Sequence, residues 1–236
     1  MNTGYYETLN ENFTQALMLY EKDYSHNELI ELLKDGNIVQ KQIAALRLEG
    51  IYSDYDAKVL LDNLTGQDGK IREAVSLKLN EFMSNPEYIK YFKNTSAYNV
   101  FLDAIIDINA NICRNVINAI SNLKEDKTFC KIFCNDLTAL TLELLAKIET
   151  FDFQEGKYKI NKEVFKLYWC LETVYLFWDK MDFDFLKQII LRSKNVQEYT
   201  IREKAAKILS CGFEDVELSA AQEELRSDNN YYVRRF

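Results

Sequence analysis

The sequence predicts an all-α protein, a right-handed α–α superhelix of about five to six stacked helix pairs. Its 236 residues include one proline and seven glycines, too few for a turn-rich β architecture. A short pattern also recurs at the start of successive amphipathic helices: a β-branched residue, a basic residue, then small or apolar residues. It occurs at Ile71-Arg72, Ile201-Arg202 and Val233-Arg234. The distances from Ile71 to Ile112 and from Ile160 to Ile201 are both 41 residues, a period typical of α-helical repeats.

The elements follow from apolar residues spaced three and four apart. Residues 5–22 have this spacing, and an acidic outer face suits an N-terminal capping helix. A short extra helix is expected after Asn85-Pro86, because proline is tolerated in a first helical turn. Another short helix is expected over 126–134. The loop 150–158 is the largest departure from a minimal repeat. The helix pairs are predicted at 27–34 with 38–50, 55–64 with 69–83, 98–107 with 110–123, 135–149 with 159–179, 183–193 with 198–210, and 215–226 with a helix beginning where the chain stops.

We therefore expect one continuous α-solenoid domain over residues 1–236. Residues 1–25 form its cap, and residues 26–236 form repeats of which the last is incomplete. Because this last repeat lacks most of its second helix, we expect either a truncation after Phe236 or an open end that docks on another subunit.

These features resemble HEAT repeats, antiparallel helix pairs with an aspartate in the turn and a valine and arginine opening the second helix. The match covers almost the whole chain after residue 26, but repeat two has Gly66 at the strict acid position and repeat four lacks both features. In that family the turn acid and the basic residue form a hydrogen-bond ladder between repeats. The resemblance implies this structural role for Asp35, Lys41, Arg72, Asp107, Arg202, Asp228 and Arg234.

Composition bounds the function. The formal net charge is −8, whereas nucleic-acid binding usually shows as a basic patch on a basic domain, so a nucleic-acid partner is not expected. Five cysteines lie in apolar helical segments and no apolar segment opens the chain, which indicates a reduced, cytoplasmic protein. Charged residues interrupt every apolar run before it is long enough to span a membrane.

Three groups of residues were weighed for chemistry. His26 is the only histidine, and Ser25 or Asn27 beside it is expected to cap a helix. Cys130 and Cys134 share a helix face, as metal-binding thiolates or, by the interpretation we favour, as core residues. The acidic run Asp179 to Asp184 is interpreted as a turn whose Asp182 or Asp184 caps the next helix. We predict no catalytic residue, metal or cofactor.

The helix over 159–179 is the most unusual segment. Lys162, Lys166 and Trp169 lie opposite an apolar stripe, and second helices line the concave face of HEAT-like arrays. A tryptophan flanked by two lysines there is predicted to contact a partner. The alternative is that this helix is apolar nearly all round because it is central and covered.

These observations favour a non-enzymatic protein-interaction scaffold whose partner is another protein. One alternative is a DNA-processing enzyme, because some HEAT-like proteins of similar size resemble alkylpurine DNA glycosylases, although no motif here matches their residues. A second is a helper module for a chromophore-attachment complex, a role taken by some HEAT-like proteins. Fold alone does not decide between them.

Overall fold

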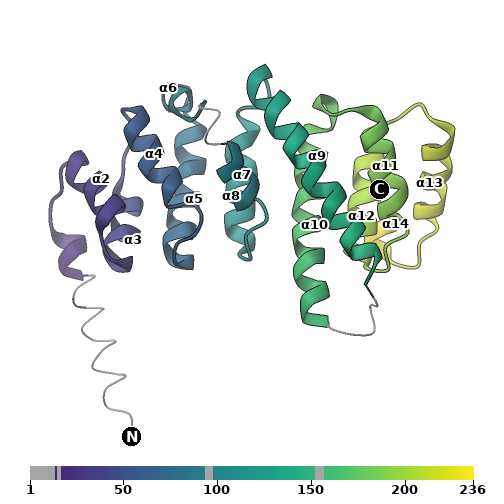
Figure 1. Ribbon diagram of the computed structural model, residues 1–236, viewed down its shortest axis with the longest axis horizontal. Coiled ribbons are helices and arrows are strands. Elements are labelled where there is room, and N and C mark those ends of the chain that lie inside the picture. The colour runs from purple at the N-terminus through teal and green to yellow at the C-terminus, as the bar shows by residue number, and fades with distance from the viewer. Residues whose placement is uncertain (1–13, 15–16, 94–97, 152–156) are drawn as a thin grey trace, which may run out of the picture. The chain divides into compact units, whose positions relative to one another are not determined.

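The computed structural model describes residues 14, 17–93, 98–151 and 157–236, and every regular element within these ranges is a helix (Figure 1). The chain divides into two compact units. Unit 1 comprises residues 1–104 with 114–122, and unit 2 comprises 105–113 with 123–236. The single domain expected over residues 1–236 stays a prediction. Of the predicted capping helix 5–22, residues 17–21 are helical, whereas 1–13 and 15–16 lie outside the described residues.

Unit 1 begins with two helix pairs. The first helices of both pairs contact each other, α2 with α4, and so do the second helices, α3 with α5. Reciprocal capping boxes start α2 and α3, since Ser25 and Asn37 each accept the amide of the residue three positions on while that side chain bonds back. The helices are α2 (His26–Asp35), α3 (Ile38–Arg47), α4 (Asp54–Asp62) and α5 (Gly69–Met83).

A short insertion completes this part of unit 1. Asn85 caps α6 (Pro86–Ile89) and a 3-10 turn, Lys90–Phe92, follows it. The insertion packs against α4 and α5, where Phe92 is fully buried and Tyr88 meets Phe82 edge-on at 5.8 Å. Helices α7 (Tyr98–Ala104) and α8 (Ala110–Ser121) follow, and the boundary between the units passes through α8.

Unit 2 shows the stacking of a solenoid most clearly. Its first helices form one row, with contacts from α9 to α11 and from α11 to α13. Its second helices form another row, in which α10 contacts α12 and α12 contacts α14. The helices are α9 (Lys127–Glu149), α10 (Lys157–Phe177), α11 (Phe183–Ser193), α12 (Tyr199–Leu209), α13 (Val216–Arg226) and α14 (Tyr231–Arg234) (Figure 1). Each unit therefore has the repeat-solenoid arrangement expected from the sequence.

Some predicted boundaries were wrong, among them the end of the helix predicted over 98–107, which is Ala104. The short helix at 126–134 and the helix at 135–149 are one helix, α9, because no glycine or proline separates them and buried residues continue at helical spacing through Phe133, Leu137 and Thr141. The helix predicted over 38–50 ends at Arg47, since Leu48 takes an extended conformation and remains fully buried. Residues 152–156 of the predicted loop lie outside the described residues.

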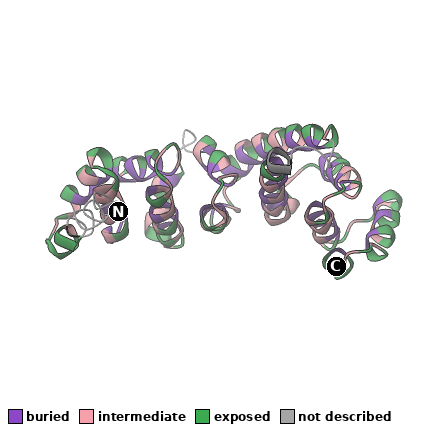
Figure 2. Cartoon of the chain, turned by 90° about the horizontal axis from the view of Figure 1, so that it is seen from below, coloured by how far each residue is buried: buried purple, intermediate pink, exposed green. Residues whose placement is uncertain are grey.

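Apolar burial holds each unit together. Buried and exposed residues lie on opposite sides of the helices (Figure 2), as amphipathic spacing requires. In unit 2, Phe129 and Phe133 stack at 4.9 Å between ring centroids, and Phe177 from α10 contacts both rings. Each aromatic side chain of this kind buries roughly 150–250 Å², so such contacts dominate the packing of α9 on α10.

Candidate functional site

The row of second helices in unit 2 carries a hollow that we call the aromatic hollow. Its volume is about 600 Å³, and its lining comes from α10, α12 and α14, with Glu198 just before α12 and Arg235 just after α14. Tyr199 and Tyr232 are 38% and 51% exposed there, and their ring centroids lie 6.3 Å apart. The lining residues are Asn161, Val164, Phe165, Tyr168, Glu198, Tyr199, Thr200, Glu203, Tyr232 and Arg235.

A second hollow, which we call the lysine hollow, lies on the other side of the first turns of α10. It encloses about 330 Å³ and is lined by Ile106, Ile108, Asn161, Lys162, Phe165 and Lys166. Because Asn161 and Phe165 line both hollows, we describe the two together as the groove. Ile108 is 69% exposed, a high value for a branched aliphatic side chain.

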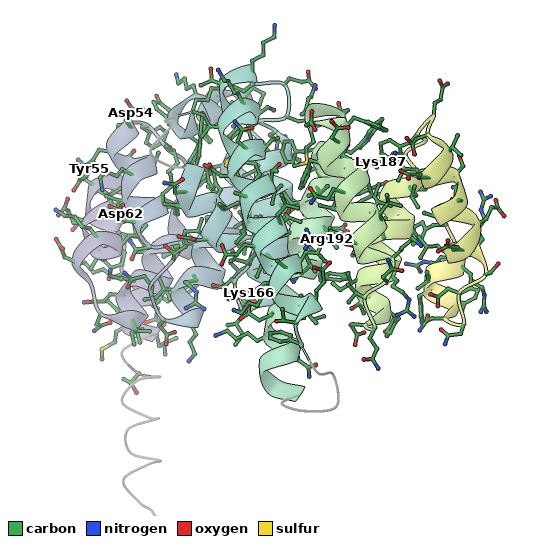
Figure 3. The ribbon with its side chains drawn as sticks, turned by 45° about the vertical axis from the view of Figure 1, so that its right-hand side comes forward. Asp54, Tyr55, Asp62, Lys166, Lys187 and Arg192 are labelled. Carbon is green, nitrogen blue, oxygen red and sulfur yellow. The ribbon has the colours of Figure 1, made fainter. Side chains whose placement is uncertain are left out.

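Charge is distributed unevenly along the groove. Lys162 is exposed and forms no ion pair with any described residue. Lys166, which Figure 3 labels, lies 3.5 Å from Glu163 on the same helix. In the aromatic hollow, Arg235 donates to Glu203 at 2.6 Å, which neutralises both charges. Glu198 caps α12, accepting the amide of Thr200 at 3.4 Å, and has no cationic partner among the described residues.

A partly buried charge cluster lies next to the aromatic hollow. Glu172 of α10 accepts hydrogen bonds from Lys204 at 2.6 Å and from Lys207 at 2.8 and 3.0 Å. The same two ammonium groups lie over aromatic rings of α10, Lys204 at 4.1 Å from the centre of Tyr168 and Lys207 at 4.2 Å from Tyr175. These contacts join α10 to α12 and hold Tyr168, a wall of the aromatic hollow, in place.

Protonation in this cluster follows from burial and pairing. Burial alone would lower the pKa of Lys204, but the hydrogen bond and charge of Glu172 outweigh it and raise that pKa. Burial would likewise raise the pKa of Glu172, yet the two lysines lower it. Both partners are therefore charged at neutral pH, and the cluster is a permanent clamp between the two helices.

The predicted partner-binding residues are placed differently from one another. Lys162 and Lys166 line the lysine hollow, whereas Trp169 is only 7% exposed and packs edge-on against Phe165 and Tyr168 at 6.1 and 5.3 Å. The indole N–H of Trp169 has no hydrogen-bond acceptor among the described residues. The tryptophan thus packs behind two rings of the groove instead of projecting from it, and partner binding at these three positions stays a prediction.

Two of the predicted ladder residues, Arg202 and Asp228, contact each other directly. Arg202 donates to both carboxylate oxygens of Asp228, at 2.7 and 3.2 Å, and also to the carbonyls of Val196 and Gln197. Arg234 donates to the Asp228 carbonyl at 2.6 Å. The guanidinium group of Arg202 lowers the pKa of Asp228, so this pair fastens the turn before α14 to α12 at neutral pH.

The other ladder residues make different contacts. Lys41 donates to the amide oxygen of buried Asn63 at 2.9 Å, which substitutes for an acid in repeat two. Arg72 donates to the Gln67 carbonyl. The remaining two acids are Asp107, which accepts the amide of Asn109 at 2.8 Å, and Asp35, which is 71% exposed and lies 3.7 Å from Lys34.

The residues considered for catalysis or metal binding lie at helix starts or in the buried core. His26 opens α2, with Nε2 2.9 Å from a carboxylate oxygen of buried Asp56. Cys130 and Cys134 are buried, and burial raises the pKa of both thiols, to about 12 for Cys134. Asp182 caps α11, as expected for the acidic run. Among the described residues no group of histidine, cysteine and acidic side chains is arranged to hold a metal.

Sequence reasoning missed the aromatic members of the groove. A signal was present, because an aromatic residue stands within the two positions before both Ile201-Arg202 and Val233-Arg234. Ile108 and Glu198 offered none, since each reaches the groove through the stacking of neighbouring repeats.

No family model and no curated protein matches this chain. Solved structures do show a likeness. An engineered protein has a TM-score of 0.48 at 15% identity over 90% of this chain and 93% of its own, and a designed armadillo repeat protein has 0.46 at 14% identity over 89% and 96%. The packing of first helices on first helices and of second on second, within each unit, is that of an α-helical repeat protein. None of the described helices has the length and apolar character needed to cross a membrane.

Proposed function

We propose that this protein is a non-enzymatic interaction scaffold that binds another protein in the groove of unit 2. The observation that carries the proposal is the pair of adjoining hollows, about 600 and 330 Å³, bounded by exposed aromatic and aliphatic side chains from successive repeats. Concave repeat surfaces of this kind provide extended binding sites.

The composition of the groove supports a protein partner. Tyrosine, tryptophan and arginine are enriched among the residues that dominate binding energy at interfaces. Tyr199 and Tyr232 present large, rigid surfaces at low conformational cost, and the hydroxyl of an exposed tyrosine remains available for hydrogen bonding. Phe165 joins them from the neighbouring repeat, so an apolar side chain of a partner would contact rings from three helices.

No specific observation favours the DNA-processing alternative. The described lining of the groove contains two acids, Glu198 and Glu203, and no aspartate, and Trp169 is buried beside it. We also propose a cytoplasmic location, supported by five free cysteines, because unpaired thiols are typical of a reducing compartment.

The test is affinity capture with the wild-type protein and with a Tyr199→Ala/Tyr232→Ala variant, followed by binding measurements between purified proteins. A Tyr55→Ala variant is the control, because Tyr55 is a similarly exposed tyrosine, 47%, in unit 1. We expect a partner that binds the wild type and the control equally and binds the double variant about tenfold more weakly or worse. Equal binding of all three forms, or retention of nucleic acid alone, would contradict the proposal.

A further inference from the structure

The two ends of the groove differ in charge. The lysine hollow contains Lys162 and Lys166 and no acid in its described lining. Its other walls are Ile106, Ile108 and Phe165, so an anion bound there would be held beside apolar surface. Lys162 has no ion-pair partner among the described residues, and Lys166 shares Glu163 with Lys147, which lies 3.1 Å from that acid.

The aromatic hollow has the opposite character. Its only described cation, Arg235, is paired with Glu203 at 2.6 Å and lies over the ring of Tyr232. Glu198 has no cationic partner among the residues that the structure describes. Within the described part of the chain, the groove therefore runs from an ammonium group without an acidic partner, Lys162, to a carboxylate without a cationic partner, Glu198, with Phe165 common to both hollows.

From this polarity we infer that the groove selects a partner segment of defined chemistry: an acidic residue, then an aromatic or aliphatic residue, then a basic residue. The acid meets Lys162 and Lys166, the apolar side chain packs on Phe165, and the base meets Glu198. The inference rests on the proposed function and deepens it, because it names the kind of peptide that the same groove binds.

Electrostatics explains why such a segment is preferred. Complementary charges at the two ends fix the register and orientation of a bound chain, and like charges placed there suppress wrong partners. A polyanion such as nucleic acid would gain from Lys162 but be repelled by Glu198. A uniformly basic peptide would meet the reverse penalty. A mixed-charge segment with an apolar centre satisfies both ends.

The experiment is selection from a displayed library of random twelve-residue peptides against the purified full chain. We expect the enriched peptides to have an acidic residue on one side of an apolar residue and a basic residue on the other. Their affinities are then measured by fluorescence anisotropy for the wild type, a Lys162→Glu/Lys166→Glu variant and a Glu198→Lys variant. The control is Lys127→Glu/Lys131→Glu, which reverses two exposed lysines at the same spacing on α9 that form no ion pair with a described residue.

Each charge reversal in the groove should weaken the selected peptides about tenfold or more, and the α9 control should stay within about twofold. A compensating peptide, with lysine in place of its acid, should bind the Lys162→Glu/Lys166→Glu variant better than the parent peptide does. Peptides that depend on Tyr199 and Tyr232 but ignore both charge reversals would overturn this inference and leave the proposed function standing. Selection of no peptide that depends on those tyrosines would overturn both.

Discussion

The charge cluster of Glu172, Lys204 and Lys207, which joins α10 to α12, should contribute strongly to the stability of unit 2. Replacing Glu172 with glutamine removes the carboxylate that pairs with Lys204 and Lys207 at 2.6 and 2.8 Å. Truncating one member of a fully buried ion pair costs about 3–5 kcal/mol. The Glu172 side chain is 24% exposed and that of Lys204 only 5%, so water relieves the loss in part. We expect the free energy of unfolding of unit 2 to fall by about 2–3 kcal/mol.

Urea unfolding followed by tryptophan fluorescence isolates this effect. Both tryptophans of the chain, Trp169 and Trp178, lie in unit 2, so their emission reports on that unit. In a thermal melt, the expected loss corresponds to a decrease in Tm of roughly 4–12 °C, at about 2–4 °C per kcal/mol for a chain of this size. Glu143→Gln serves as the control, because Glu143 is exposed on α9 and forms no ion pair with a described residue.

The stability that Glu172 contributes should depend on pH. The folded pKa of Glu172 is lowered, so its contribution is fully present above the ordinary glutamate value of about 4.3 and is lost as the pH falls through the folded value. The difference between the wild type and the variant should therefore shrink below about pH 4. Replacing Lys204 with methionine in the Glu172→Gln background should restore part of the stability, because an unpaired buried ammonium is removed. A variant within about 0.5 kcal/mol of the wild type, or a difference independent of pH, would refute this reasoning.

Three further predictions concern single residues. Asp228→Asn should lower the free energy of unfolding of unit 2 by about 1–2 kcal/mol at pH 7. The difference should shrink below about pH 4, because the native pKa of this carboxyl is lowered. Equal tryptophan-fluorescence melts of the two forms at pH 7 would be inconsistent with this prediction. Gly212→Ala should lower the free energy of unfolding by about 1 kcal/mol, because the backbone φ of Gly212 is +87°. Gly69→Ala, at the start of α5 and with open space around its Cβ position, should raise the free energy of unfolding by about 0.5 kcal/mol. Circular dichroism melts measure both effects, and the opposite order would argue against the backbone explanation. Burial raises the pKa of Cys134 and Cys170 to about 12, so iodoacetamide at pH 8 should label them only after urea is added, and rapid labelling of the native protein, read by mass spectrometry, would contradict their burial.

The sequence by itself determined the helices and much of their pairing, because these depend on local chemistry. Ser25 with Glu28 starts α2, and the break between Asp35 and Asn37 separates it from α3. The repeated isoleucine and arginine placed Arg202 at the start of a second helix, and the structure shows that it forms a bidentate ion pair with Asp228 in the following turn. A pattern that recurs from repeat to repeat predicts contacts between repeats, since each unit stacks on the next in the same way.

Only the tertiary structure decided what stands in the groove. Helical periodicity placed Lys162, Lys166 and Trp169 on one side of α10. In the structure, however, Trp169 is only 7% exposed, whereas the two lysines line a hollow. Periodicity gives the direction of a side chain around its own helix, but burial depends on what packs against that direction from elsewhere in the chain. For the same reason, the hydrogen bond between Glu172 and Lys204, and the hollow that Ile108 and Phe165 both line, arise from stacking that no local spacing encodes.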